Sequence, residues 1–515
     1  MRKQPDKRRN PAGRVPLTRK KSHRMGRRPW AIAGAAAAAA IGLVAYAVTG
    51  AAAVAHHAAG AGRLTAAQAG ATGAAQAPSP PITASAPGTG LPGALPVAAP
   101  HTGKGWMSND LMVRVPKWTG GKANCTPTTQ ALPDTQSAHP VTGGCGATAR
   151  LAAASPPGYG ATQLRAYLRL RGTGAGQSVA IVDPYDNPYV TRDIKIYSKQ
   201  FGLPLPCPAK GSVPGCFRFS VARPFGIGGL DPGSALESDL DVQMVHAIAP
   251  QASITLVEAH DNSITSLFQA IDYAAGLNPT PAVISNSWGS AEFPAETSGD
   301  QHCALSATLC VFSSGDTGNP ARYPASNPYV LAVGGTSLQL SPAGQVQSEV
   351  AWCCINQGGT GGGMSQYEPR PAYQDAVNPY QGRGTPDVSF DADPYTGVAV
   401  HDTVGLDGQN GWIEVGGTSV GAPAWSGIVA AADQLRARAH KAPLAGAGFA
   451  AQKLIYGMPH RFGFGDITHG VNNIYQCNAA EGTPVTACQA KPGYDLVTGW
   501  GSPRPGIDTA LASTR

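Results

Sequence analysis

Short apolar runs rich in β-branched residues alternate with helical stretches over the C-terminal two thirds of this chain. The expected strands are 179–182, 254–257, 283–285, 309–313 and 330–333, and the expected helices are 162–170, 266–275 and 422–438. Alternation of this kind is typical of a parallel sheet flanked by helices. The sequence therefore predicts an α/β domain with helices on both faces of the sheet. In such a sheet the functional site lies at the carboxyl ends of the strands.

A glycine-rich turn delivers a serine to the start of the last of these helices. The segment Gly416–Pro423 reads Gly-Gly-Thr-Ser-Val-Gly-Ala-Pro and runs into an apolar stretch. Glycine permits a sharp turn and leaves room for a ligand beside the hydroxyl of Ser419. The helix N-terminus adds unpaired N–H groups and a positive dipole end, which suit a developing oxyanion. Ser419 is therefore a candidate nucleophile, and the alternative is a serine that only caps the helix.

A serine hydroxyl needs a general base to become a nucleophile, and no typical histidine segment precedes Ser419. A pair of carboxyl groups is the alternative base. Glu237 and Asp241 are four residues apart in a segment that reads as a helix ended by Pro250, so they lie one turn apart on one side. Such a pair repels unless it shares a proton or takes part in acid–base chemistry. The competing interpretation is a capping box formed by Ser234 and Glu237.

The third segment is a Ser-Gly-Asp turn that ends at Asp316, directly after an expected strand. Alone it is typical of an ordinary turn. Taken in order, Glu237 with Asp241, then Asp316, then Ser419 resemble the sedolisins, the serine-carboxyl peptidases. Further matching motifs are Gln-Ser-Val-Ala-Ile-Val-Asp at 177–183, Ser-Asn-Ser-Trp-Gly at 285–289, Thr-Gly-Gly-Gly-Met-Ser at 360–365, Pro-Asp-Val-Ser at 386–389, Asp-Ile-Thr at 466–468 and the Gly-Tyr-Asp to Trp-Gly-Ser-Pro stretch at 493–503.

The resemblance covers about residue 157 to the C-terminus and implies a subtilisin-like fold. It also implies a role for each matching residue. Ser419 would attack the peptide carbonyl, Glu237 would accept its proton, Asp241 would hold Glu237, and Asp316 would donate a hydrogen bond to the tetrahedral oxyanion. A carboxyl group donates only while protonated. The expected activity is therefore that of an acid-active serine-type endopeptidase on polypeptide substrates.

The resemblance further implies one structural calcium ion near the C-terminus. Asp466 and Asp495 match the family's two carboxylate ligands, and the backbone carbonyls of Ile467, Lys491 and Gly493 would complete the shell with water. Oxygen atoms of this kind are the ligands that a hard cation prefers. Lys491 departs from the glycine that the family usually has there. The alternative is a pair of acidic loop residues without a metal ion.

Three other functions stay open from the sequence. The first is a tripeptidyl-peptidase, an exopeptidase of the same family, because the sequence does not distinguish that action from endopeptidase action. A catalytically silent relative would use the cleft only to bind peptides, although the intact Glu237, Asp241, Asp316 and Ser419 favour an enzyme. A Ser-His-Asp hydrolase with Asp183 as the acid would need a histidine that the motifs do not supply.

The first 156 residues contain targeting and linker sequence rather than a domain. Residues 1–29 hold twelve Lys and Arg residues against one Asp, so they account for all of the net charge of +7 and the remainder is acidic. We therefore expect a basic cytoplasmic region and no nucleic-acid partner. The apolar, alanine-rich segment 30–55 is long enough to cross a bilayer and ends in a small-residue cleavage pattern.

We accordingly expect segment 30–55 to be a cleaved signal or a retained transmembrane anchor that places a monomeric protein outside the cytoplasm, secreted or membrane-anchored. Residues 56–103 are Ala, Gly, Pro and Thr-rich, which predicts a low-complexity linker. Residues 104–156 are expected to form a short arm or residual pro-segment, and 157–515 the peptidase domain.

All ten cysteines follow the apolar segment, and an even number outside the cytoplasm predicts disulfides. Plausible local pairs are Cys125–Cys145, Cys207–Cys216 and Cys477–Cys488. Adjacent cysteines do not readily bond each other, so Cys353 and Cys354 are expected to pair with Cys303 and Cys310. A zinc site formed by those four residues is the alternative.

Overall fold

The computed structural model describes residues 94–96, 107–109, 112–114 and 156–513, except 212, 356–357, 407–408, 445–447, 460–461 and 473–484. All of them fall in one compact unit, 87–515. Among the described residues every helix is too short or too polar to cross a bilayer. The predicted segment 30–55, the basic region before it, and Cys125, Cys145 and Cys477 lie outside the described residues.

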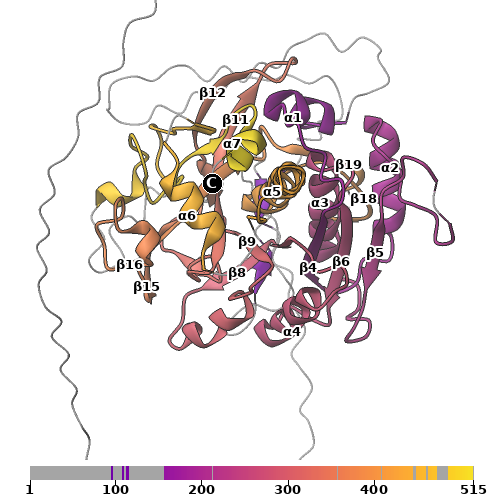
Figure 1. Cartoon of the computed structure of the whole chain (residues 1–515), viewed down its shortest axis with the longest axis horizontal. Coiled ribbons are helices and arrows are strands. Elements are labelled where there is room, and N and C mark those ends of the chain that lie inside the picture. Colours follow the sequence, from indigo (N-terminus) through magenta and orange to yellow (C-terminus); the bar gives the residue numbers. More distant parts are fainter. Residues whose placement is uncertain are drawn as a thin grey trace, which may run out of the picture. The chain divides into compact units, whose positions relative to one another are not determined.

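An eight-stranded sheet forms the centre of the domain, in the order β12-β11-β9-β7-β4-β6-β5, with β17 also paired to β11 (Figure 1). Its strands are β4 (Ser178–Pro184), β5 (Phe219–Ala222), β6 (Ser253–Ala259), β7 (Val283–Asn286), β9 (Leu309–Ser313), β11 (Val330–Leu340), β12 (Val346–Ala351) and β17 (Val388–Asp391). Every pairing is parallel except that of β12 with β11. The predicted α/β class, built on a parallel sheet, is confirmed.

Successive residues of the central strands point to opposite faces, and each face meets its own helices. Val179 and Ile181 belong to the larger core cluster with α3 and α5, whereas Ala180 and Val182 join α4 on the other face. The helices are α1 (Ala161–Leu168), α2 (Val190–Phe201), α3 (Pro232–Ile248), α4 (Ile264–Ala275), α5 (Gly421–Arg438), α6 (Ala450–Gly457) and α7 (Ile507–Ser513). The prediction of helices on both faces is thus confirmed.

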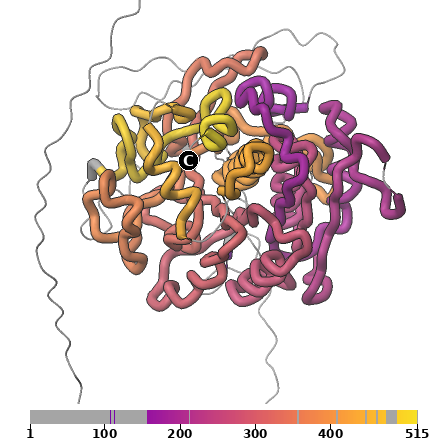
Figure 2. Tube along the Cα trace, viewed as in Figure 1, coloured from indigo at the N-terminus to yellow at the C-terminus, as the bar shows by residue number. Residues whose placement is uncertain are grey.

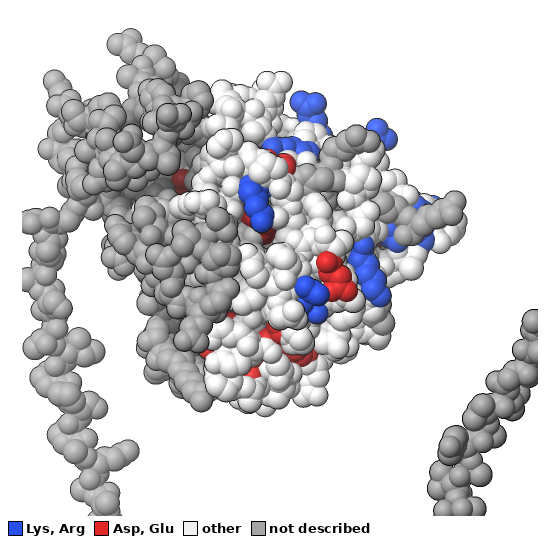
Figure 3. Space-filling view, turned by 90° about the vertical axis from the view of Figure 1, so that its left-hand side faces the viewer, with Lys and Arg blue, Asp and Glu red and all other residues white. Residues whose placement is uncertain are grey.

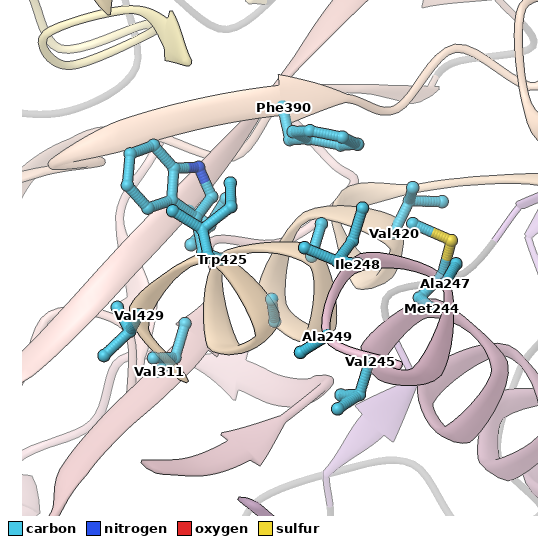
Figure 4. Close-up of a cluster of buried hydrophobic side chains, with 14 of the residues drawn as sticks. Met244, Val245, Ala247, Ile248, Ala249, Val311, Phe390, Val420, Trp425 and Val429 are labelled. Carbon is cyan, nitrogen blue, oxygen red and sulfur yellow. The ribbon is translucent and has the colours of Figure 1, made fainter. Parts of the chain in front are cut away.

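The larger core cluster joins the C-terminal end of α3 to the start of α5. Figure 4 shows Ile248 of α3 next to α5, with Trp425 of α5 facing Phe390 of β17. Gly427 permits this approach, because a Cβ atom there would lie 2.7 Å from Cβ of Ile248. The contact fixes α3, which carries Glu237 and Asp241, relative to α5, which begins two residues after Ser419.

Shorter strands lie around the sheet. The hairpin β18 (Val398–Leu406) and β19 (Gln409–Gly416) pairs through β19 with β3 (Met112–Arg114), which in turn pairs with β1 (Ala94–Pro96). A second small sheet contains β10 (Arg322–Tyr323), β8 (Trp288–Ala291) and β2 (Ser108–Asn109). The remaining pairs are β13 (Cys353–Ile355) with β14 (Gly358–Gly359), β15 (Gly363–Pro369) with β16 (Gly382–Thr385), and β20 (Phe464–Gly465) with β21 (Ser502–Pro503).

The trace in Figure 2 separates the two ends of the folded domain. The early segments through β6, drawn in purple and magenta, lie on the right, as does the orange hairpin of β18 and β19, and the C-terminal segments in yellow lie on the left. The face shown in Figure 3 is largely uncharged, and its Lys, Arg, Asp and Glu side chains are scattered over it. The low share of charged residues, 13% of the chain, agrees with that surface.

The cysteine pairing differs from the prediction. Cys207 is bonded to Cys216 as expected, but Cys303 is bonded to Cys310, and Cys353 to Cys354. The chain turns back after residue 303 and brings the Cα atoms of Cys303 and Cys310 to 5.8 Å, within the usual range for a disulfide.

The expected pairing of Cys353 and Cys354 with Cys303 and Cys310 is therefore wrong. The left-handed backbone of Cys354, with φ of 72°, accompanies the bond between these neighbours. The zinc alternative is wrong as well, because sulfurs joined in disulfides are not available as thiolate ligands. Cys488 is also disulfide-bonded.

Candidate active site

The turn that carries Ser419 lies between β19 and α5. It is a single 3-10 turn, Thr418–Val420, and Ser419 within it is fully buried. Gly417 has a left-handed φ of 94°, and a Cβ atom on Gly416 would lie 2.5 Å from the carbonyl oxygen of Ala392. Both glycines are therefore required by the backbone geometry, as the sequence pattern predicts.

Helix α3 holds Glu237 and Asp241 inside the protein. Almost every residue of α3 is buried, because it packs against α1, α2, α5, β18 and the sheet. Both carboxyl groups are fully buried, and α3 also contacts the turn that carries Ser419. A helix buried on all sides usually has apolar residues on all sides. Glu237 and Asp241 depart from that pattern, because carboxyl groups prefer to be solvated.

The helix begins differently from the capping-box alternative. Its N-cap is Asp231, whose side chain accepts hydrogen bonds from the backbone N–H and the hydroxyl of Ser234, each at 2.8 Å, and Pro232 follows at the first helical position. Ser234 is thus inside the helix, and the capping box of Ser234 with Glu237 is wrong. Glu237 has no role at the end of the helix.

Ser287 connects Asp241 to the turn of Ser419. The Ser287 hydroxyl lies 2.9 and 2.8 Å from the two oxygens of Asp241, and 3.5 Å from the carbonyl oxygen of Ser419. Ser287 directly follows β7, at the carboxyl end of the parallel sheet. It belongs to the Ser-Asn-Ser-Trp-Gly motif, so its position after a strand was a signal that the sequence analysis did not use.

Asp316 follows β9 and binds the residue that precedes Ser419. Its Oδ1 accepts hydrogen bonds from the backbone N–H and the hydroxyl of Thr418, each at 2.8 Å. The same hydroxyl accepts a bond from the backbone N–H of Gly315 at 3.1 Å. Thr418, which the sequence analysis did not single out, therefore locks the Ser-Gly-Asp turn to the turn of Ser419.

The Thr-Gly-Gly-Gly motif packs against the Ser-Gly-Asp turn. The N–H of Gly361 donates to the carbonyl oxygen of Gly315 at 2.6 Å, and the hydroxyl of Ser314 donates to the carbonyl oxygen of Gly361 at 2.7 Å. A Cβ atom at Gly361 would lie 2.0 Å from the carbonyl oxygen of Ser314. The approach of the two backbones explains why the motif consists of glycines.

A third buried carboxyl group, Asp183, interacts with Asp241. Burial raises the pKa of Asp183, and Ser238 partly opposes the rise. Burial and the charge of Asp183 raise the pKa of Asp241, while the hydrogen bond from Ser287 lowers it. The protonated form is therefore favoured within this pair.

The contacts of His246, His302 and His401 give no support to the Ser-His-Asp alternative with Asp183. The Nε2 of His246 lies 3.0 Å from the carbonyl oxygen of Pro204. His302 and His401 pair through Nδ1 with Asp272 and Asp193, at 2.8 and 2.9 Å. None of these contacts involves Asp183 or Ser419.

The predicted calcium ligands come together in two C-terminal loops. Asp466 follows β20, and its Oδ2 accepts a hydrogen bond from the N–H of Gly493 at 3.1 Å. Asp495 accepts from the N–H of Lys491 at 2.9 Å. Ile467 is buried beside Asp466. Burial raises the pKa of Asp495 to about 6, and its backbone donors lower it. Two carboxyl groups facing one loop fit a hard cation in their donor chemistry.

A separate acidic cluster lies on the opposite side of α3. Asp193, Asp239 and Asp402 are buried and within reach of one ion. Donors already meet them: the Nδ2 atom of Asn187 on Asp239, the N–H of Thr403 on Asp193, and the N–H of Val404 on Asp402. These bonds account for the cluster, and Asp239 points away from Ser419.

Comparison with known proteins bears on the family and the fold. Residues 228–465 match the model of the subtilase family. Kumamolisin from Bacillus sp. (strain MN-32) is 32% identical over 357 residues, which are 64% of this chain and 59% of that protein. Tripeptidyl-peptidase SED2 of Arthroderma otae (strain ATCC MYA-4605 / CBS 113480) is 30% identical over 333 residues, 53% of this chain and 51% of that protein.

Among solved structures, Pseudomonas sedolisin, a serine-carboxyl proteinase complexed with two molecules of pseudo-iodotyrostatin, superimposes with a TM-score of 0.56 at 26% identity. The match covers 70% of this chain and 98% of that one. The chain spans about half to three fifths of the length of the curated relatives it matches. Its sheet, the turns around Ser419 and these similarities support a sedolisin-family, subtilisin-like protein.

Proposed function

We propose that this protein is an acid-active serine-carboxyl endopeptidase. The observation that carries the proposal is the convergence of three distant segments at the carboxyl ends of the strands. Asp241 on α3 is linked through Ser287 to the turn of Ser419, and Asp316 is linked through Thr418 to the same turn. A nucleophile, a buried carboxyl pair and an oxyanion donor are the parts that peptide hydrolysis requires.

In the proposed mechanism the Oγ of Ser419 attacks the peptide carbonyl while Glu237 accepts the hydroxyl proton. Asp241, held by Ser287, orients Glu237 one turn away. Glu237 then returns the proton to the leaving amine, and an acyl-enzyme forms. A water molecule, deprotonated by the same carboxyl group, resolves the acyl-enzyme in the second half of the reaction.

The negative oxygen that forms in each half-reaction meets Asp316 and the N–H of Ser419. Because Oδ1 of Asp316 already accepts two bonds from Thr418, Oδ2 is the atom that would carry a proton toward the substrate. Only the protonated acid donates, and an ionised Asp316 would repel the oxyanion. This requirement supports activity under acid conditions.

Calcium belongs to this proposal as one structural ion. Asp466 and Asp495 would bind it with the carbonyl oxygens of Ile467, Lys491 and Gly493. The ion would neutralise two carboxylates from loops that are distant in the sequence and would hold those loops together. It supplies stability and no step of the reaction.

The cellular location of the enzyme is also part of this proposal. The basic region followed by segment 30–55 supports a location outside the cytoplasm, secreted or anchored by that segment. The second candidate function is tripeptidyl-peptidase activity, favoured by the similarity to a relative of that name. Polypeptides are the proposed substrates in both cases.

The test is digestion of a denatured protein at acid and at mildly alkaline pH, with the fragments identified by mass spectrometry. We expect internal cuts at acid pH by the wild type and none by Ser419→Ala. A helix-start serine contributes only about 1 kcal/mol as a cap, so the variant should remain folded. Release of tripeptides alone would favour the second candidate, and equal digestion by Ser419→Ala would refute both.

A further inference from the structure

Four carboxyl groups gather beyond the end of β8, outside the candidate active site. Glu292 directly follows β8, Glu296 and Asp300 lie in the 3-10 helix η1 (Glu296–His302), and Glu368 lies on β15. Glu296 and Glu368 are almost fully buried, at 1% and 2% exposed. Helix η1 contacts β15, so segments about 70 residues apart meet here. These four groups are called the carboxyl cluster below.

Hydrogen bonds join the carboxyl cluster to the backbone around it. Oε2 of Glu292 accepts a bond from the backbone N–H of Gln366 on β15, at 3.0 Å. Oε2 of Glu296 accepts from the backbone N–H of Phe293 at 2.7 Å, and Oε1 of Glu296 accepts from the hydroxyl of Ser326 at 3.3 Å. The first of these bonds links the end of β8 to β15, and the second closes the turn that leads into η1.

The acids of the cluster are also hydrogen-bonded to one another in two pairs. Glu292 is bonded to Glu296, and Asp300 is bonded to Glu368. An ionised carboxyl group is only an acceptor, so each of these bonds requires a proton on one partner. Oε1 of Glu368 is buried and accepts no bond from an N–H or hydroxyl group among the described residues. Each pair is therefore complete only while it holds a proton.

Burial and mutual repulsion favour the protonated form of the cluster. Burial and the charge of Glu292 raise the pKa of Glu296, and burial and the charge of Asp300 raise the pKa of Glu368. An acid whose pKa is raised by folding stabilises the folded form fully below its unfolded value, which is about 4 for a glutamate. That contribution is lost as the pH rises through the folded values.

Other charged or titratable groups beside the cluster do not replace the shared protons. Arg383 on β16 lowers the pKa of Glu368 less than burial raises it. Tyr323 on β10 lies 3.4 Å from Oδ1 of Asp300 through its hydroxyl, and burial raises the pKa of Tyr323, so it stays neutral. His302, at the end of η1, pairs through Nδ1 with Asp272 on α4 at 2.8 Å.

The backbone between Glu292 and Glu296 needs these contacts. Ala295 has a left-handed φ of 72°, a conformation that residues other than glycine rarely adopt. Such a residue persists where the surrounding structure fixes it. The bonds of Phe293 to Glu296 and of Gln366 to Glu292 are the contacts that fix this turn. Ionisation of the cluster therefore weakens the support of an unfavourable turn.

We propose that the carboxyl cluster is a pH-sensitive switch that holds segment 292–302 against β15 under acid conditions and releases it as the pH rises toward neutrality. On ionisation each pair loses its shared proton and becomes two like charges in a buried place. The release is local, because the central sheet supplies no member of the cluster. Since β8 runs from Ser287 into this segment, the change reaches the strand beside the candidate active site. The proposal goes beyond the proposed peptidase function and does not depend on it.

The test is amide hydrogen exchange, read by mass spectrometry, on the full chain with Ser419→Ala, which prevents self-cleavage. Peptides from 292–302 and 363–369 report the opening of the two joined segments, after correction for the intrinsic exchange rate at each pH. The opening constant should rise by up to about tenfold per pH unit for each proton lost. Glu296→Gln supplies an amide that donates to Glu292 without a titrating proton, so the rise should be about tenfold per pH unit shallower.

Two further variants separate the cluster from its surroundings. Glu368→Gln changes the second pair and should make the rise shallower in the same way, so it decides the question if Glu296→Gln does not fold. Asp272→Asn is the matched control, because it alters an exposed acid that pairs with His302 at the end of the same helix. It should leave the pH dependence unchanged. Exchange in β4 and β7 should be the same in every variant.

An equal pH dependence in the parent, Glu296→Gln and Glu368→Gln would overturn the proposal. Loss of the dependence in Asp272→Asn alone would assign it to His302 and would overturn the proposal as well. The peptidase function is read separately, as hydrolysis at acid pH by chains that retain Ser419. Hydrolysis with an unchanged exchange profile would refute the switch and leave the peptidase, and a shallower profile without hydrolysis would do the reverse.

Discussion

The buried carboxyl groups near Ser419 and those of the C-terminal loops are placed in opposite ways. Asp495 accepts hydrogen bonds from the backbone N–H groups of Lys491, Val497 and Thr498. Asp241 accepts from the hydroxyl of Ser287 and has another carboxyl group, Asp183, as its electrostatic neighbour. Backbone donors favour the ionised form, whereas burial beside a like charge favours the protonated form.

The difference in hydrogen-bond donors separates a carboxyl group that holds a loop, Asp495, from carboxyl groups suited to proton transfer. Asp495 accepts hydrogen bonds from backbone N–H groups that fix its loop, and these donors partly offset the rise in its pKa that burial causes. The acids around α3 are arranged so that a proton can be held and moved, which is expected where acid–base catalysis takes place. Substitution should therefore reduce mainly activity in the first region and mainly stability in the second.

The largest effect should come from Glu237→Gln. An amide cannot accept the serine proton, so kcat should fall by about two to four orders of magnitude with little change in melting temperature. The matched control is Asp239→Asn, a buried acid on the same helix that faces Asn187 and Gln243 instead. It should keep most of the activity, and an equal loss in both variants would show that the helix, not the base, had been damaged.

Asp316→Ala should reduce kcat by about two to three orders of magnitude, because one oxyanion donor is typically worth about 2.7–4 kcal/mol. Substrate binding should change little, since the oxyanion exists only during the reaction. Asp316→Asn keeps a donor that never ionises. If Asp316 controls the loss of activity at higher pH, the alkaline limb of the kcat profile should move upward in that variant. Full kcat in Asp316→Ala would exclude the role.

Asp495→Ala should test the second region through stability. It leaves buried backbone N–H groups of Val497 and Thr498 without their acceptor, at a cost of about 1–3 kcal/mol, which calorimetry would detect. A calcium chelator should lower the melting temperature of the wild type, since binding contributes about 2.7 kcal/mol at a hundredfold excess over Kd. The chelator should not affect Asp495→Ala.

Asp241→Asn should show the reverse pattern, with a small loss of stability and a large loss of activity.

A further effect should be a change in the pH dependence of stability, with no change in mechanism. The folded pKa of Asp183 is raised above its unfolded value by burial, to about 7. Its contribution is therefore complete below about pH 4 and is lost as the pH rises through the folded value. Asp183→Asn should make the fall in unfolding free energy between those values shallower, by at most about 1.4 kcal/mol per pH unit. An unchanged slope would mean that Asp183 is not the titrating group.

Much of the fold was predictable because local sequence determines it. Strand β9 coincides with the predicted 309–313, and β4, β6, β7 and β11 each contain their predicted run. Helices α1, α4 and α5 also lie within two residues of the predicted ends. Buried strands of a parallel sheet are continuous apolar runs, so their positions can be read directly from the sequence.

The errors concern features set by distant contacts. Asp231 caps α3 in place of Ser234, since both residues suit an N-cap and only the packing selects one. The cysteine pairing depended on where the chain turns after residue 303. Ser287 and Thr418 act through bonds to residues 46 and 102 positions away. No local pattern predicts such pairings, and the same holds for strands β2 and β3, which lie in the range expected as a short arm.

The most direct test of the account is kcat/KM for a peptide substrate as a function of pH. A carboxyl base with a protonated carboxyl donor predicts a profile with its maximum at acid pH that falls toward neutrality. The fall should occur in wild type while the protein is still folded by circular dichroism. A profile that rises through neutrality to an alkaline plateau would contradict the carboxyl mechanism, because it would require a base of the histidine type.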